Sequence, residues 1–472
     1  MDGLKPRFAH FKKKIQMSKR ELFIRICLIL ALFVISALIQ HFVSSWFLKI
    51  NGGSLEYFHE SGVYWEAVND AKVYYEPYLL AFREGNWDIY QPGQELPLKG
   101  YYYGPYFAYF LAFISLFVDL FTNASEAFVV EQTVRIAPFL FDAFSAVMIF
   151  LIIDGKLSKS KKSRKRTYIA ICVALCYNFM PIVLFYNGVL GLNSYMFTSL
   201  TLLSLYFIEK KKPMAAGSIL TLSFLTKQMS LFFLPIWFLI LVRNDVEESI
   251  KFLMAFFLSF ILLSLPWIFK HPTYYIGVLL GQGYSGITHF TISQEYILYS
   301  TTPFHSLLII GADKLAYVYY ILNKIYIPFI VFSLIFYRIA LIKGDHLFDN
   351  RNSFFTFNAI YIIGIHMFIS RGVYKNYYTF LIPFILIALA EWITNIKRNW
   401  MSIVLLISML FWLIGVNILI IWLSKYIHTI LLVLFWIPLF ITYNKEMHLA
   451  LFLKENYEKT ANYFKRILHI IK

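Results

Sequence analysis

Apolar runs of about twenty residues recur along almost the whole of this 472-residue chain. Each run is long enough to cross the hydrocarbon core of a bilayer, roughly 30 Å thick, as a single α-helix. The composition agrees, because 59% of the residues are hydrophobic and 15% are charged, whereas soluble domains average about 25% charged residues. The sequence therefore predicts an all-α polytopic membrane protein and excludes a soluble one.

The net charge of +16 raises the question of a nucleic-acid partner. The Lys and Arg residues, however, form short clusters between apolar runs, as cytoplasmic loops do under the positive-inside rule. We therefore predict anionic membrane lipid as the counter-charge and no nucleic acid. The expected location is an integral, multi-pass one, in the cell membrane of a prokaryote or the endoplasmic reticulum of a eukaryote.

Two basic clusters constrain the topology, KPRFAHFKKKIQMSKR at 5–20 and KLSKSKKSRKR at 156–166. If both are cytoplasmic, an even number of crossings separates them. Three apolar runs lie between them, at 22–45, 101–121 and 131–154, so one run does not cross. The run 101–121 is rich in tyrosine and opens at a Gly-Pro pair, which favours a helix lying along the outer surface. Residues 46–130 then form one long extracytoplasmic segment.

The same reasoning predicts about twelve transmembrane helices, with both termini cytoplasmic. The domain plan is a basic cytoplasmic N-terminus (1–21), a single transmembrane domain (22–443) and a basic amphipathic cytoplasmic tail (444–472). The apolar stretch 213–242 is interpreted as two short helices that meet at Lys227, because one tilted helix would place the later basic clusters outside. The predicted spans are 22–45, 131–154, 168–187, 194–208, 210–226, 228–243, 251–269, 315–342, 353–370, 377–393, 400–423 and 428–443.

Asp70 is the outstanding acid of the predicted outer segment. It follows the first span closely, with Trp65, Tyr74 and Tyr75 nearby. A carboxylate there could act as a general base toward an acceptor hydroxyl. The alternative is a solvated loop carboxylate, one of several in this segment.

Arg135 and Asp142 lie seven residues apart in the second predicted span. Two helical turns would bring them to one face, with Asp142 deeper by about 10 Å. An acid at that depth is unfavourable unless it faces a partner or water, so a functional role is one interpretation. A structural ion pair that joins helices is the other.

Three further features offer cations or donors at a predicted outer surface. Lys227, with Gln228 beside it, could bind phosphate as a compact charge, or could extend to the interface as lysines in spans do. The segment ISRGVYKNYYTFLIP (369–383) suits a phosphate clamp, or ordinary lipid headgroup contacts. The residues singled out in this segment are Arg371, Tyr374, Lys375 and Tyr378. No cluster has metal-ligand spacing, so a divalent ion is compatible with the sequence but not required.

Several motifs occur in a characteristic order. They are D-x-x-x-Y-Y-x-P from Asp70, GNWDIY at 85–90, YYGPY at 102–106, R-x-x-P-x-x-x-D from Arg135, G-x-L-G-x-N-S at 188–194 and LTKQ at 225–228. This arrangement resembles that of the polyprenyl-phosphate-sugar-dependent glycosyltransferases of the GT-C superfamily, and the mannosyltransferase-like branch is the most similar. Gly104 departs from the pattern, since proline or threonine usually stands there.

The resemblance implies a GT-C-like fold with surface-lying helices in a long first outer loop that carries the catalytic aspartate. It implies transfer of a hexose, with mannose favoured, from a polyprenyl-phosphate-linked donor to a hydroxyl of a glycan, glycolipid or protein on the extracytoplasmic face. Asp70 matches the catalytic aspartate, Lys227 a lysine after a short helix, and the Arg371–Tyr378 segment a late loop near the lipid phosphate. Substrate-supporting roles are the hypothesis for Tyr103, Arg135, Asp142 and Gln228.

The expected reaction is direct displacement with inversion. The donor leaves as a phosphate and needs no strong protonation, so one base and several cations suffice. The rival interpretation is a twelve-span transporter or a flippase for lipid-linked oligosaccharide. Transporters often show two similar halves, whereas the long segment 46–130 has no counterpart in the second half of this chain, which favours the enzyme.

Overall fold

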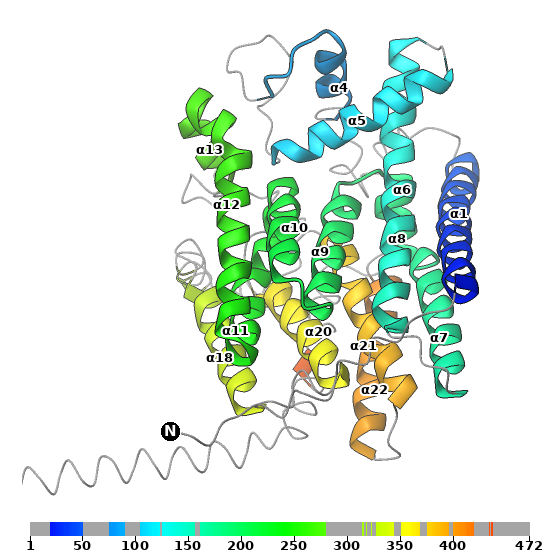
Figure 1. Ribbon diagram of the computed structural model, residues 1–472. Helices are drawn as coiled ribbons and strands as arrows, with labels where there is room; N and C mark the ends of the chain where they lie inside the picture. The colour runs from blue at the N-terminus through cyan, green and yellow to red at the C-terminus, as the bar shows by residue number, and fades with distance from the viewer. Residues whose placement is uncertain are drawn as a thin grey trace, which may run out of the picture.

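The computed structural model describes residues 19–50, 75–89, 104–122, 125–155, 161–279, 327–343, 351–368, 375–395 and 400–419, with a few single positions between 314 and 437. Every regular element in these ranges is a helix, and they contain no strand. The longer helices run side by side as a bundle (Figure 1). The predicted all-α class is confirmed.

Within the described part of the chain, five helices are long and apolar enough to cross a membrane. A bent pair, with an angle of 44° at the break, would make a sixth. Four of them are Lys19–Trp46 in α1 (Lys19–Ile50), α5 (Pro105–Thr122), α6 (Glu126–Asp154) and α12 (Val246–Lys270). The fifth, Tyr377–Thr394, joins η5 (Lys375–Phe380) to α21 (Ile382–Asn395). The bent pair consists of Lys165–Asn178 in α7 (Lys161–Asn178) and Pro181–Val189. Twelve crossings stay a prediction.

The remaining helices are short, and most coincide with predicted spans. They are α4 (Glu76–Arg83), α8 (Pro181–Val183), η3 (Leu184–Val189), α9 (Ser194–Glu209), α10 (Pro213–Thr226), η4 (Gln228–Phe232), α11 (Phe233–Asn244), α13 (Pro272–Leu279), α18 (Ile327–Lys343), α20 (Arg351–Phe368), α22 (Trp400–Ile414) and η6 (Gly415–Leu419). The last predicted span, 428–443, lies almost wholly outside the described residues.

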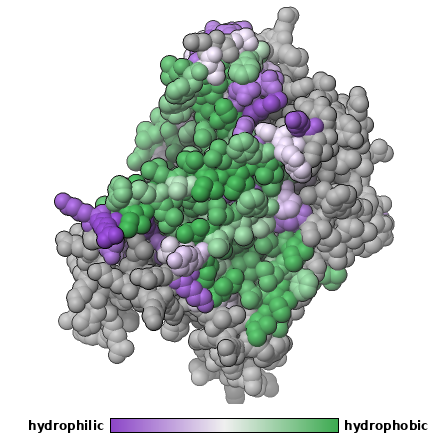
Figure 2. All heavy atoms as spheres, turned by 90° about the vertical axis from the view of Figure 1, so that its right-hand side faces the viewer, coloured by the Kyte–Doolittle hydropathy of each residue, from purple (hydrophilic) through white to green (hydrophobic). Residues whose placement is uncertain are grey.

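The outer surface of the bundle is hydrophobic over a broad area. Figure 2 shows a continuous hydrophobic surface between hydrophilic groups above and below it. Large apolar side chains of α1 and α12 are half or more exposed, among them Leu30, Phe42, Met254 and Leu258. Such a surface would be unfavourable in water, and it is the surface expected of helices in contact with lipid.

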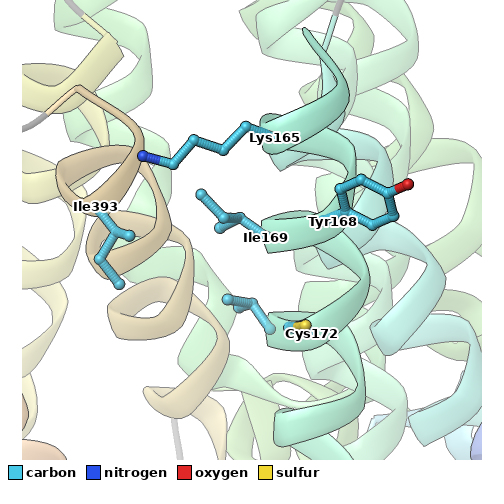
Figure 3. Close-up of a pocket in the computed structure, with 6 residues that line it drawn as sticks. Lys165, Tyr168, Ile169, Cys172 and Ile393 are labelled. Atoms are coloured by element: carbon cyan, nitrogen blue, oxygen red, sulfur yellow. The ribbon is translucent and has the colours of Figure 1, made fainter. Parts of the chain in front are cut away.

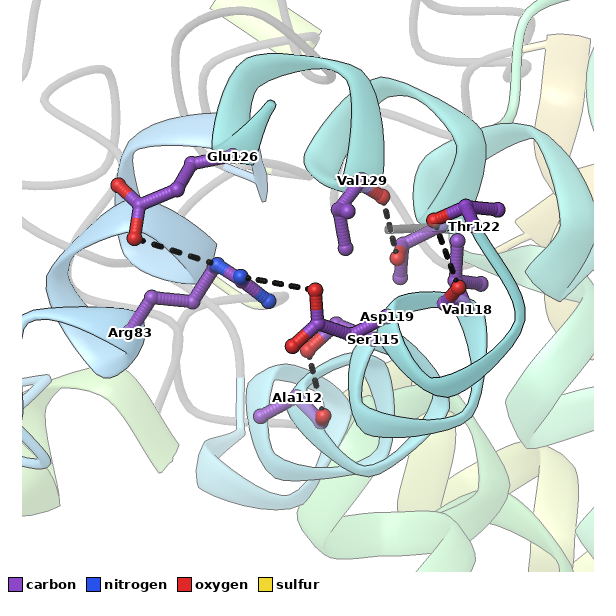
Figure 4. A network of polar contacts seen from close by, with 9 residues as sticks. Arg83, Ala112, Ser115, Val118, Asp119, Thr122, Glu126 and Val129 are labelled. Atoms are coloured by element: carbon purple, nitrogen blue, oxygen red, sulfur yellow. Dashed lines mark hydrogen bonds and ion pairs between the residues drawn. The ribbon is translucent and has the colours of Figure 1, made fainter. Parts of the chain in front are cut away.

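The helix α5 does not run parallel to the bundle but lies across one end of it, next to α4 (Figure 1). Besides its apolar buried face, α5 makes polar contacts with its neighbours. The Arg83 guanidinium of α4 contacts the carboxylate of Asp119 on α5 at 3.2 Å and that of Glu126 on α6 at 3.9 Å (Figure 4). The Tyr106 hydroxyl donates to the Leu263 carbonyl of α12 at 3.1 Å. One arginine thus holds three consecutive helices together at this end.

The opposite end of the bundle carries a second polar network. Arg25 of α1 pairs with Asp154 at the end of α6 at 3.1 Å, and the Thr167 hydroxyl donates to the same carboxylate at 2.7 Å. The neighbouring Arg166 pairs with Glu391 of α21, whose side chain is fully buried. Arg166 belongs to the predicted cytoplasmic cluster 156–166, whereas Arg25 lies near the start of the predicted first span, 22–45. Both arginines join the ends of neighbouring helices here.

Candidate functional site

Lys227 occupies a break between two short helices, as the sequence predicted. The α10 helix ends at Thr226, Lys227 has an extended backbone with φ −156° and ψ 137°, and η4 begins at Gln228. The Lys227 side chain is 4% exposed. Its ammonium donates to the Asn193 side-chain oxygen at 2.6 Å and lies 4.2 Å from the centre of the Tyr377 ring. A cation is therefore held at a helix break by an amide oxygen and an aromatic face.

Asn193 belongs to a polar chain that leads from Lys227 toward the middle of α6. Ser194, the next residue, donates to the Asn187 side-chain oxygen at 2.9 Å, and the Asn187 amide donates to Asp142 at 3.0 Å. The Tyr177 hydroxyl donates to the same Asp142 oxygen at 2.8 Å. The other Asp142 oxygen is buried and has no hydrogen-bond partner among the described residues. The buried Asp142 and the buried Lys227 thus belong to two hydrogen-bonded groups, which are joined through the backbone of the consecutive residues Asn193 and Ser194.

The aromatic element before α5 approaches the same helix break. A Cβ built on Gly104 would lie 1.8 Å from the Leu225 carbonyl oxygen and 3.1 Å from the Thr226 nitrogen. Only a residue without a side chain allows the two backbones to come this close. Glycine at position 104 therefore has a steric reason, and the close approach brings the start of α5 to within two residues of Lys227.

The late segment contributes Tyr377, not the predicted Tyr378. The Tyr378 side chain is fully buried, with its ring 6.2 Å from that of Trp412, while Tyr377 faces Lys227. Both lie on η5, a 3₁₀-helix, in which successive side chains diverge by about 120° because each turn has about three residues. Neighbouring tyrosines consequently point to different environments. The side chain of Lys375, at the start of η5, lies outside the described residues.

Arg135 and Asp142 do not share one environment, which corrects the expectation of a common functional face. The Arg135 side chain is 46% exposed and pairs with Glu131 at 2.6 Å, one turn back on α6. Asp142 is fully buried and binds donors from other elements. The two positions are about 10 Å apart along the helix axis, and only the deeper one is enclosed by neighbours. An Arg135–Asp142 ion pair is likewise not formed.

The remaining predicted site residues are only partly described. Gln228 begins η4 and is half-buried. Asp70, Tyr103, Arg371 and Tyr374 lie outside the described residues. Their predicted roles stay predictions.

The sequence interpretation did not assign roles to Tyr177, Asn187, Asn193, Ser194 and Tyr377, which the structure brings to this cluster. Asn193 and Ser194 end the G-x-L-G-x-N-S motif, so a signal for them was present in the sequence. Tyr377 is adjacent to Tyr378, which the sequence analysis had singled out as a candidate substrate-binding residue. Tyr177 had no signal, because a tyrosine in an apolar helix is usual and only its partner Asp142 distinguishes it.

Among the described residues, no group of three or more His, Cys, Asp or Glu side chains could hold a metal ion. The Asp142 cluster contains one carboxylate, two amides, two hydroxyls and one ammonium. These groups suit hydrogen bonding to a polar or anionic substrate better than metal coordination, which favours several carboxylates or imidazoles.

We expect the substitution Asp142→Leu to destabilise the protein by about 1–3 kcal/mol for each buried donor that it leaves without an acceptor. Two donors, the Tyr177 hydroxyl and the Asn187 amide, depend on one Asp142 oxygen. Asp142→Asn keeps that oxygen and the shape of the side chain, so it serves as the control. In the same detergent, the unfolding temperature of Asp142→Asn should be close to that of wild type, and that of Asp142→Leu should be well below it. Equal stability of the leucine variant would contradict this account.

A second polar cluster lies at the end of the bundle where α5 lies. The Asp88 carboxylate, in the turn after α4, pairs with the Lys270 ammonium at 2.6 Å and lies 2.9 Å from the His271 ring nitrogen. Burial raises the pKa of the Asp88 carboxyl, but the hydrogen bonds and charges of His271 and Lys270 outweigh burial, so that the pKa falls below its ordinary 3.8. This cluster joins the turn after α4 to the end of α12.

The lowered pKa of Asp88 predicts that the stability of the fold decreases at acidic pH. A carboxylate whose pKa is lower in the folded chain stabilises the fold fully above its ordinary value of 3.8 and loses that effect as pH falls through the lowered pKa. The difference in unfolding temperature between wild type and Asp88→Asn should therefore shrink as pH falls below 3.8. If the difference in unfolding temperature grew as the pH fell, the predicted lowering of the Asp88 pKa would be wrong.

A surface hollow of about 460 Å³ lies between α7 and α21, well away from Lys227 along the chain (Figure 3). Its lining residues are Lys165, Tyr168, Ile169, Cys172, Val173 and Ile393. Apart from the Lys165 ammonium and the Tyr168 hydroxyl, the labelled side chains are apolar. Tyr168 and Ile393 in its lining are exposed, and none of the lining residues belongs to the Asp142–Lys227 cluster.

The described site thus consists of a helix break with Lys227, a polar chain to Asp142, and docked contributions from the segments at Gly104 and Tyr377. No protein-family model, no curated protein and no solved structure matches this chain.

Proposed function

We propose that this protein is an integral membrane glycosyltransferase that uses a polyprenyl-phosphate-linked hexose as donor. In this proposal the chain has a GT-C-like fold with about twelve spans, and residues 46–130 form an extracytoplasmic segment over the site. The acceptor is a hydroxyl of a glycan, glycolipid or protein. Mannose is the favoured sugar, because the motif order resembles the mannosyltransferase-like branch.

One observation carries the proposal: motifs that are far apart in the sequence converge on the helix break at Lys227. The amide of Asn193 binds the ammonium, Tyr377 of the late segment covers it, and Gly104 packs on the carbonyl two residues before it. These are the G-x-L-G-x-N-S motif, the 369–383 segment and the YYGPY element, respectively. Random motif matches would have no reason to meet at one point, whereas parts of one site would.

The chemistry of the proposed reaction fits a lysine in this position. As the donor's anomeric bond to the phosphate breaks, negative charge grows on the departing phosphate oxygens, and fixed cations stabilise that charge. Lys227 is a preorganised cation, and Arg371 and Lys375 supply further positive charge in the proposal. Asp70 accepts the proton of the acceptor hydroxyl as its oxygen attacks the anomeric carbon from the opposite side, so the configuration inverts.

The direct test is incubation of the purified protein with radiolabelled polyprenyl-phosphate mannose, glucose, galactose or arabinose and a membrane extract. We expect label from one donor to enter an acceptor, which mass analysis then identifies. A flippase or transporter would move a lipid-linked substrate between vesicle leaflets without forming a labelled product. Leaflet movement together with an absence of transfer for every donor would refute the enzyme and favour that alternative.

Replacement of Lys227 by Met should weaken donor binding by about tenfold or more, since a hydrogen bond to a charged group contributes about 1.5–3 kcal/mol. Lys212→Met is the matched control, because Lys212 stands exposed at the other end of the same helix, α10. Donor KM for both variants measures the effect. If the donor KM of Lys227→Met equalled that of Lys212→Met and of wild type, Lys227 would have no role in phosphate binding.

A further inference from the structure

A hollow of about 380 Å³ lies between the turn that follows α4 and the end of α12. Its size falls within the range of small-molecule sites, about 300–1,000 Å³. Residues from two distant parts of the chain line it, namely Gly85, Asn86, Trp87, Asp88, Pro266, Trp267 and Lys270. It includes the Trp-Asp pair of the GNWDIY motif, to which the proposed mechanism gives no role.

Trp87 is held in a fixed orientation although 52% of its surface is exposed. Its indole stacks on the Phe82 ring at 5.2 Å and 19° and lies 6.3 Å from the nearly parallel Tyr109 ring. The Tyr109 hydroxyl donates to the Trp87 carbonyl at 2.9 Å. Tyr109 in turn stacks on Trp267, in the wall of the hollow, at 5.7 Å. The aromatic stack therefore presents a rigid ring to the outside, and a ligand would lose little ordering free energy by packing on it.

Polar groups stand beside this ring. The Asp88 side chain is 7% exposed and the Lys270 side chain 60%, with 2.6 Å between carboxylate and ammonium. The Asn86 side-chain oxygen accepts from the Asp88 backbone nitrogen at 3.1 Å and so fixes the turn. Because the carboxylate and the ammonium neutralise each other, an ionic ligand is not needed to balance the charge of the hollow. It offers hydrogen-bond donors and acceptors beside an apolar face.

We propose that this hollow binds a neutral saccharide, with the C–H face of a pyranose ring on Trp87 and its hydroxyls at the Asp88–Lys270 pair. A sugar ring has one face rich in C–H groups, which packs on an aromatic ring, and hydroxyls that both donate and accept hydrogen bonds. A purely apolar ligand would leave the polar wall without partners. The inference rests on the proposed function in one respect: it assigns the saccharide as the acceptor glycan.

The binding test uses the purified full-length protein and saturation-transfer NMR with methyl α-D-mannopyranoside and the matching glucoside and galactoside. We expect a saturable signal from at least one glycoside, and we expect Trp87→Ala to lower the affinity for that glycoside about tenfold. Phe113→Ala is the matched control, because Phe113 is an exposed aromatic residue of α5 that does not line the hollow. Lys270→Gln, which alters an exposed side chain, is a second test that should weaken binding without disturbing the aromatic stack.

Absence of a saturable signal with all three glycosides, or an equal signal from wild type and Trp87→Ala, would overturn the inference. In the transfer assay, Trp87→Ala should raise the acceptor KM and leave the donor KM unchanged. Transfer with an unchanged acceptor KM would refute only the inference, whereas glycoside binding without any transfer would refute only the proposed function.

Discussion

Asp70→Asn should reduce transfer by about 10²- to 10⁴-fold, the usual contribution of a general base. Asparagine keeps the size of the side chain but cannot accept a proton from the acceptor hydroxyl. Binding of the lipid-linked donor depends on the cations and the apolar groove in the proposal, so it should not change. Single-turnover transfer and a donor-binding measurement on the same preparation separate the two effects.

Glu84→Gln is the control for this experiment. Glu84 is an exposed carboxylate in the turn after α4, in the same predicted outer segment, and its loss should leave transfer near the wild-type rate. Near-normal turnover by the Asp70→Asn variant would remove Asp70 from the mechanism. Labelling that found position 70 on the cytoplasmic side would do the same, because the donor phosphate and the base must meet on one side of the membrane.

Gly104→Ala should lower both stability and activity, and it is the largest structural effect that we expect from one added methyl group. The new Cβ would lie 1.8 Å from the Leu225 carbonyl oxygen and 2.4 Å from its carbon. Both are backbone atoms, so no side chain can rotate away and either α5 or the end of α10 must move. Overpacking of this kind costs about 1–3 kcal/mol.

The functional consequence follows from the position of the contact. Leu225 is two residues before Lys227, so a shift of the α10 end also displaces the cation. Thermal unfolding and donor KM should therefore change together. Gly85→Asn is the control for thermal unfolding and donor KM, since nothing lies within 4 Å of its Cβ and asparagine tolerates its φ of +84°. It is not a control for acceptor KM, because Gly85 lines the hollow proposed for the acceptor. If the alanine variant at Gly104 were as stable and active as wild type, the docking of α5 on this break would be refuted.

The sequence by itself determined the helical class and most helix positions. An apolar run long enough to cross a bilayer satisfies its backbone hydrogen bonds only as a helix, so run length and flanking charges were sufficient. The break at Lys227 was also predictable, because a single tilted helix over 213–242 would have placed the later basic clusters outside the membrane. The unusual acid Asp142 could be identified on the same ground, since its position in a span needs a partner.

Only the tertiary structure decided what those residues contact. Sequence spacing indicated that Arg135 and Asp142 share a face, yet one is exposed and the other enclosed, because burial depends on which neighbours cover each turn of α6. The choice between Tyr377 and Tyr378 depends on the 3₁₀ geometry of η5, and the need for Gly104 depends on a carbonyl 121 residues later. Contacts between distant segments arise from packing, and the local pattern of one segment carries no information about the surface it will meet.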